Sequence, residues 1–78
     1  MQQAAPPQPR QQANLTPREL DVLNLIAQGQ TTAEIALNLA IANSTVKTHV
    51  RNLKKKLAAS NRAEAVAHAL QQGLLKPE

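Results

Sequence analysis

From Leu15 onward, apolar residues recur at steps of three and four positions, which is the spacing of one face of an α-helix. The clearest run is Val46, Val50, Leu53 and Leu57, at steps of four, three and four. No segment shows the two-residue alternation of a half-buried strand, and no internal repeat is present. The pattern predicts an all-α fold with four helices between residue 15 and about residue 75.

Two T-x-x-E sequences mark the starts of the first and second helices. Thr16 with Glu19, and Thr31 with Glu34, can each form a capping box, in which each side chain accepts a bond from the other residue's backbone amide. The first helix should run to Gln28 and close at a left-handed glycine, the next residue. Its apolar residues occupy more than one face, so it should lie centrally and pack on two neighbours.

The later helices follow the same logic. The second should be short and end near Leu39, and the third should occupy about residues 43–57 with Asn43 as its cap. Asn61 and a glutamate three residues later predict a capping box for the fourth helix. Its expected apolar face is Ala63, Val66, Ala67, Leu70 and Leu74.

Residues 1–14 differ from the rest, because they hold five Gln, three Pro and three Ala, with Arg10 as their only charge. A segment with so little to bury cannot offset the entropy of ordering. We expect a disordered linker over 1–14 and one domain over 15–78, and the linker suggests a piece excised from the C-terminal end of a longer protein.

Composition excludes several classes of function. The 78 residues include no Cys, Trp, Tyr or Phe, 14 Ala and two His. Without cysteine there is no disulfide framework, thiol nucleophile or cysteine zinc site, and two histidines make a metal centre improbable. No apolar run approaches the roughly 20 residues that span a bilayer, and no signal peptide is evident. We expect a soluble, cytoplasmic protein that is not an enzyme and uses no cofactor or metal.

The net charge of +4 is concentrated in the third helix. Residues 44–57 carry +5, whereas residues 15–43 carry −2 and residues 58–78 are neutral. On a helical projection, Lys47, Thr48, Arg51 and Lys55 lie opposite the apolar stripe, on a face without acidic residues. Such a face suits the major groove of DNA, which admits one α-helix. A protein-interaction module that docks an acidic partner is the alternative, and a membrane-surface helix ranks lowest because the helix has no aromatic anchor.

A short helix, a tight turn and a basic helix form the layout of a helix-turn-helix, in which the second helix enters the major groove. The chain resembles the LuxR-type (NarL/FixJ-type) helix-turn-helix domain of bacterial transcription regulators from Leu15 to about Leu75. The matching segments are L-T-P-R-E at 15–19, V-L at 22–23, A-Q-G at 27–29, E-I-A at 34–36, S-T-V-K-T-H-V at 44–50, K-L at 56–57, Arg62 and E-A-V at 64–66. The resemblance implies a four-helix (tetrahelical) fold.

The resemblance also implies the contacts with double-stranded DNA. Base contacts would come from Lys47, Thr48 and Arg51. Contacts with the DNA backbone would come from Thr32, Asn43, Ser44 and Thr45, with Lys54 and Lys55 adding electrostatic attraction. The fourth helix would pair two domains into a homodimer on DNA, and Ala65 and Ala69 offer a small-residue face for this contact. An equally good interpretation is that the two alanines are helix-forming residues on a solvated surface.

The resemblance further implies a C-terminal output domain of a response regulator, controlled by a phosphorylated receiver domain. An autoinducer-binding domain is the second choice, and RNA polymerase is a further candidate partner. Three positions depart from the family. Ala40 stands where the turn usually has Gly, Ala42 where Ser or Thr caps the third helix, and Thr32 where Asn is common. We expect His49 to flank the core and His68 to lie on the surface.

Overall fold

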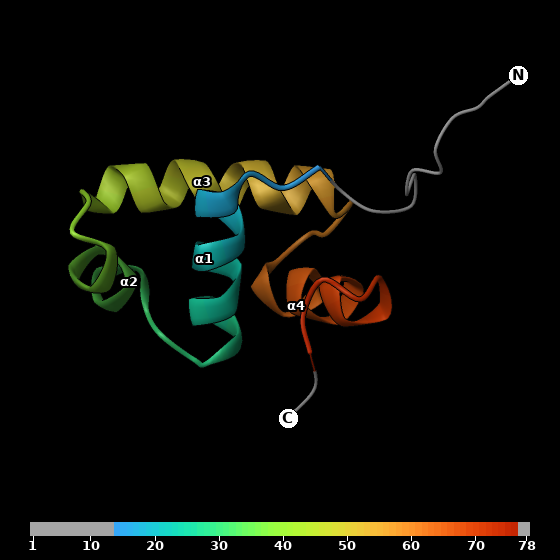
Figure 1. Ribbon diagram of the computed structural model, residues 1–78. Coiled ribbons are helices and arrows are strands. Elements are labelled where there is room, and N and C mark those ends of the chain that lie inside the picture. The colour runs from blue at the N-terminus through green and yellow to red at the C-terminus, as the bar shows by residue number, and fades with distance from the viewer. Residues whose placement is uncertain (1–13, 77–78) are drawn as a thin grey trace, which may run out of the picture.

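The computed structural model describes residues 14–76, which form four α-helices and no strand. The helices are α1 (Pro17–Ala27), α2 (Thr32–Leu39), α3 (Asn43–Lys56) and α4 (Arg62–Gln71). Helix α1 packs against the other three, and α3 lies across it with α2 and α4 on either side (Figure 1). The predicted all-α fold and the central first helix are confirmed. Apart from residue 14, the expected linker lies outside the described residues.

Both predicted capping boxes are present at the starts of α1 and α2. Thr16 Oγ1 accepts from the Glu19 amide at 3.1 Å, and the Glu19 carboxylate accepts from the Thr16 amide at 3.0 Å. Thr31 and Glu34 make the same pair of bonds at 3.1 and 2.9 Å. After α1, Gly29 has a φ of 87°, the left-handed conformation predicted for it. The first two helices are therefore set by local sequence signals.

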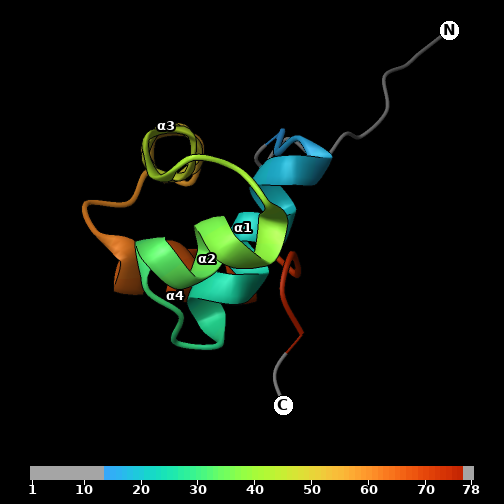
Figure 2. The same ribbon diagram turned by 90° about the vertical axis from the view of Figure 1, so that its left-hand side faces the viewer.

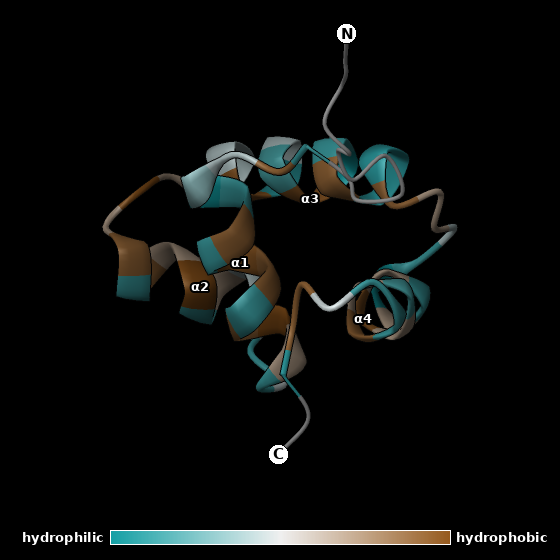
Figure 3. Cartoon of the chain, turned by 45° about the vertical axis from the view of Figure 1, so that its right-hand side comes forward, coloured by the Kyte–Doolittle hydropathy of each residue, from teal (hydrophilic) through white to brown (hydrophobic). Residues whose placement is uncertain are grey.

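The apolar stripe of α3 faces the core as predicted. Val46, Val50, Leu53 and Leu57 are buried against residues of α1, α2 and α4, including Leu23. Figure 3 shows the hydrophobic side of α3 turned toward the other helices and hydrophilic residues on its outer side. Burial of one face thus fixes which side chains of α3 point to solvent.

The turn between α2 and α3 departs from the predicted capping. Ala40 has φ 57° and ψ 46°, so an alanine adopts the left-handed conformation at the end of α2. Ala42 is the N-cap of α3 and makes no side-chain capping bond, which makes Asn43 the first helical residue rather than the cap. A second left-handed alanine, Ala58 with φ 55°, follows α3 and was not predicted. An L-residue in this conformation costs roughly 1–2 kcal/mol.

Helix α4 is rotated relative to its predicted orientation. Ala65 and Ala69 are fully buried, with 0% exposure each, whereas Leu70 is 41% exposed and Ala63 and Ala67 are exposed. The predicted apolar face is therefore wrong at Ala63, Ala67 and Leu70, whereas Val66 and Leu74 are partly buried and pack against the core as predicted. Small side chains allow α4 to lie close to its neighbours, and Leu75, beyond the helix end, fills the core beside them.

Two polar contacts of α4 also differ from the predictions. The side chain of Asn61 accepts from the Glu64 amide at 2.8 Å, but the Glu64 carboxylate accepts from the amide of Ser60 at 2.7 Å. His68 is not a surface residue. It is half-buried, and its Nδ1 lies 2.7 Å from the carbonyl oxygen of Leu57. This contact joins α4 to the end of α3, and the rotation that buries the two alanines also brings His68 inward.

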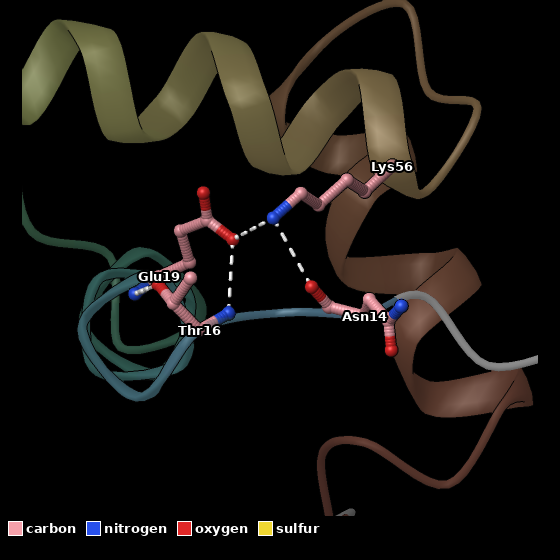
Figure 4. A network of polar contacts seen from close by, with 4 residues as sticks. All are labelled: Asn14, Thr16, Glu19 and Lys56. Atoms are coloured by element: carbon pink, nitrogen blue, oxygen red, sulfur yellow. Dashed lines mark hydrogen bonds and ion pairs between the residues drawn. The ribbon is translucent and has the colours of Figure 1, made fainter.

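Lys56 links the segment before α1 to the C-terminal end of α3. Nζ of Lys56 donates to Oε1 of Glu19 at 2.7 Å and to the carbonyl oxygen of Asn14 at 3.1 Å (Figure 4). The segment before α1 therefore runs beside the C-terminal half of α3, as Figure 1 also shows. Asn14, placed in the linker by the sequence, belongs to the folded unit. Within residues 14–76, no helix is long and apolar enough to cross a membrane.

Candidate nucleic-acid interface

The outer face of α3 is a basic surface at the edge of the molecule. Lys47, Thr48, Arg51 and Lys55 are exposed there, and His49 is half-buried beside the apolar stripe, as expected. Figure 2 views α3 end-on, with α2 below it. Because the opposite face is held in the core, these side chains can only point outward.

Helix α2 and the turn after it hold the N-terminal end of α3. Ile35 and Ala36 of α2 are buried in the same cluster as Val46 of α3. The amide of Ile41 donates to the carbonyl oxygen of Ala36 at 3.0 Å, which closes the turn made by the left-handed Ala40. The two helices therefore form a packed helix-turn-helix unit, in which α3 is the second helix of the motif.

The N-terminus of α3 exposes groups that suit an anion. Asn43, Ser44 and Thr45 are exposed, and no side chain caps the first turn. The positive end of a helix dipole and open backbone amides form a favourable site for a phosphate group. All three residues are therefore accessible for the backbone contacts predicted for them.

The hydroxyl of Thr48 is already engaged within α3. Its Oγ1 donates to the carbonyl oxygen of Ser44 at 3.1 Å. With the proton directed at the helix, the oxygen lone pair and the methyl group remain for other contacts. This arrangement is compatible with a methyl contact to thymine, the role expected of Thr48.

The basic residues of the outer face have no acidic partners in the described part of the chain. The two ion pairs within residues 14–76 are Arg18 with Asp21 at 3.6 Å and Lys56 with Glu19. Neither involves Lys47, Arg51, Lys54 or Lys55. The positive charge on the outer face of α3 is therefore uncompensated by ion pairs within the described residues, which favours binding to a polyanion.

Thr32 lies next to a basic residue that the sequence analysis did not assign to the interface. Nη2 of Arg62, the first residue of α4, donates to Oγ1 of Thr32, the first residue of α2. Both belong to a pocket beside α3 that is also lined by Lys47 and Lys54. Arg62 was missed because its segment is neutral overall, and only the fold brings it to α3.

The dimer face predicted on α4 is corrected by the packing. Ala65 and Ala69 are completely buried within the domain, so neither can contact a second copy. The larger apolar residues that α4 leaves accessible are Leu70, at 41% exposure, and the half-buried Val66. Both line an open groove between α1 and α4, together with Asn24, Ala27, Gln28, Leu75 and Lys76.

Comparison with known proteins agrees with this geometry. Residues 13–69 match the family model described as "Bacterial regulatory proteins, luxR family". The chain is 53% identical over 74 residues to "Probable transcriptional regulatory protein NarL" of Mycobacterium tuberculosis, covering 95% of this chain and 32% of that protein. It is 46% identical over 70 residues to "HTH-type quorum sensing-dependent transcriptional regulator RpaR" of Rhodopseudomonas palustris, covering 90% and 29%. The chain thus spans about a third of the length of these relatives.

Two solved structures resemble the fold. The response regulator ChrA of a heme-sensing two-component system superposes with a TM-score of 0.77 at 35% identity, over 91% of this chain and 33% of that one. The transcription factor GerE superposes with a TM-score of 0.75 at 34% identity, over 80% of this chain and 92% of that one. The helix-turn-helix with its uncompensated basic helix, the family match and these neighbours lead to one conclusion: the chain belongs to the luxR family of bacterial regulatory proteins and is a DNA-binding domain of a transcription regulator.

Proposed function

We propose that the domain recognises a specific DNA sequence by placing α3 in the major groove. The observation that carries the proposal is that α3 buries one face completely and presents on the other a row of basic residues without acidic partners in the described chain. Lys47 and Arg51 would donate to guanine O6 and N7, and the Thr48 methyl would contact thymine.

Phosphate contacts would hold α3 in register. The open N-terminal turn of α3, with Asn43, Ser44 and Thr45, would bind one phosphate, and Lys54 and Lys55 would add electrostatic attraction. Thr32 would contact the backbone from the start of α2. Such contacts supply affinity and orientation, whereas the base contacts supply sequence preference.

On paired half-sites, two copies would associate through α4. Leu70 and Val66 replace the two buried alanines as the contact residues, because they are the larger apolar side chains that α4 leaves accessible. The small area favours a monomer or a weak dimer away from DNA. Half-sites about one helical turn apart, roughly 10 bp, would suit such a pair.

In the whole regulator, this domain would be the output domain of a cytoplasmic two-component response regulator, with RNA polymerase as a further partner. The structural similarity to ChrA, a response regulator, supports this context. The similarity to RpaR supports the second candidate, an autoinducer-responsive regulator. Treating the full-length protein with a small phosphodonor tests the first, because a receiver domain would gain one phosphoryl group by mass.

Selection of bound sequences from a random duplex library, followed by titration of the preferred duplex against scrambled DNA at several salt concentrations, tests DNA reading. We expect a short enriched motif and a preference that persists as salt rises. A single chain and a covalently linked pair should be compared, because a weak dimer could hide the preference of the single chain. Equal binding of all duplexes by both forms would contradict the proposal and favour an acidic protein partner.

A further inference from the structure

A pocket of about 400 Å³ opens between α2, α3 and α4. Its lining is strongly basic and contains no acidic residue: Thr32, Lys47, Val50, Arg51, Lys54 and Arg62. The pocket borders the outer face of α3, so a duplex lying on α3 would pass over it. A site with this lining suits a group that carries negative charge.

The hydrogen bond from Arg62 to Thr32 joins two helices that do not otherwise pack together. Helices α2 and α4 do not pack against each other, since each contacts α1 and α3 instead. The guanidinium group of Arg62 nevertheless reaches Oγ1 of Thr32. This bond occupies an acceptor position of the hydroxyl oxygen, and the hydroxyl proton remains available to donate to a third group.

Arg62 also keeps donors for a ligand. A guanidinium group has five N–H donors in a planar fork that matches phosphate oxygens, and the contact with Thr32 is the one side-chain bond that Arg62 makes within residues 14–76. The acidic residue closest along α2, Glu34, accepts from the Thr31 amide at 2.9 Å and does not pair with Arg62. The cation therefore has no carboxylate partner in the described chain.

We propose that Arg62 binds a phosphate of the DNA backbone in this pocket, together with the hydroxyl of Thr32 and the ammonium group of Lys54. The proposal rests on the proposed function and extends the interface from the helix-turn-helix to α4. Arg62 has two roles in it. It donates directly to the phosphate, and it holds Thr32 so that the hydroxyl proton points to the same oxygen atoms.

The test uses the preferred duplex from the library selection, with single phosphates replaced in turn by uncharged methylphosphonates. At one position, we expect the replacement to weaken binding of the unmodified chain about tenfold, because a charge-assisted bond is lost. Arg62→Gln should bind the original duplex about tenfold more weakly and lose less than twofold further at that same position. Lys55→Gln is the matched control, since Lys55 lies on α3 outside the pocket and should leave the sensitivity of that phosphate unchanged.

Folding is checked by circular dichroism, and a second pair of variants covers the case in which Arg62→Gln does not fold. Thr32→Val should reduce the sensitivity of the same phosphate, whereas Thr32→Ser, which retains the hydroxyl, should preserve it. If folded Arg62→Gln remained as sensitive as the unmodified chain at every phosphate, the Arg62 proposal would be overturned while DNA recognition stood. If the unmodified chain preferred no duplex, even as a linked pair, the proposed function itself would fail.

Discussion

Nζ of Lys56, at the end of α3, lies 2.7 Å from Oε1 of Glu19 in the first turn of α1, and Glu19 is 4% exposed. Burial alone would raise the pKa of Glu19, but hydrogen bonds from Lys56 and the Thr16 amide, with the charges of Lys56 and His49, outweigh it. The pKa of Glu19 is therefore lowered from its ordinary value. The carboxylate thus links α1 to α3 in its ionised form.

This linkage predicts a pH-dependent stability. Because the pKa of Glu19 is lower in the folded than in the unfolded state, its stabilising effect is complete above the ordinary glutamate pKa and is lost as pH falls through the lower folded-state value. Glu19→Gln should lower the free energy of unfolding by about 2 kcal/mol at pH 7 and by less at pH 3. Urea unfolding between these pH values measures it, with Asp21→Asn at an exposed site as the control. Parallel pH profiles for Glu19→Gln and the unmodified chain would contradict the linkage.

The packing of α4 predicts opposite responses to enlarging alanines on its two faces. Ala69→Leu should destabilise the domain by roughly 1–3 kcal/mol, because a buried position has no room for the added atoms. Ala67→Leu, on the exposed face of the same helix, should change stability by less than about 0.5 kcal/mol. Thermal unfolding of both variants decides the orientation of α4. Equal losses would mean that α4 is rotated from the position described.

The left-handed Ala40 predicts a stabilising substitution. Ala40→Gly should raise the free energy of unfolding by up to about 1 kcal/mol, because glycine adopts a φ of 57° without the steric cost that alanine bears. Ala33→Gly, in the first turn of α2, should instead lower it by roughly 0.5–1 kcal/mol. Chemical denaturation provides both values. A loss at position 40 comparable to that at position 33 would argue against a strained turn.

The geometry of α3 predicts that its basic residues divide into two groups. Lys47→Ala or Arg51→Ala should lose about 1–3 kcal/mol on the preferred duplex and relax the base preference at one position. Lys55→Ala should weaken preferred and scrambled DNA similarly and reduce the salt slope by about one. Titrations on both duplexes give these quantities. Uniform losses for all three variants would remove the distinction between base and phosphate contacts.

The accessible apolar residue of α4 predicts how paired binding would be lost. Leu70→Glu should reduce the affinity for two half-sites about tenfold or more and leave binding to a single half-site within twofold, because only the contact between copies is removed. Leu37→Glu is a suitable control, since Leu37 is 83% exposed on α2, away from the groove between α1 and α4. Gel shifts on single and paired sites compare them. Retained cooperativity in Leu70→Glu would place the dimer contact elsewhere.

Local signals in the sequence were sufficient for most of the fold. The capping boxes, Gly29 and the four-residue stripe of α3 each follow from residues within a single helix and its ends. The orientation of α4 did not follow, because seven of the nine residues after Arg62 are alanine, valine, leucine or glutamine and give little contrast between faces. Contacts with residues distant in the chain decide which alanines are buried. At the turn, the resemblance marked Ala40 as standing where glycine is usual, but no local signal showed that the alanine itself adopts the left-handed conformation.

The residues of the candidate interface that lie on α3 could be predicted from the sequence, but the residue that α4 contributes could not. A helix with one apolar face determines its own outward residues, so Lys47, Thr48 and Arg51 were placed correctly on the exposed side. Arg62 lies 30 positions from Thr32 in the chain, and only the arrangement of three helices brings the two side chains together. Contacts of that range leave no periodic trace in a single sequence.

The uncompensated charge on the outer face of α3 makes dissolved ions act in opposite directions on the free and the bound domain. In the free domain, neighbouring cations repel one another, so added salt relieves this self-repulsion and stabilises the fold. In the complex, the same ions compete for the phosphates and weaken attachment. Higher ionic strength therefore favours the unbound domain in two ways: it raises the stability of the free domain, and it lowers the affinity for DNA.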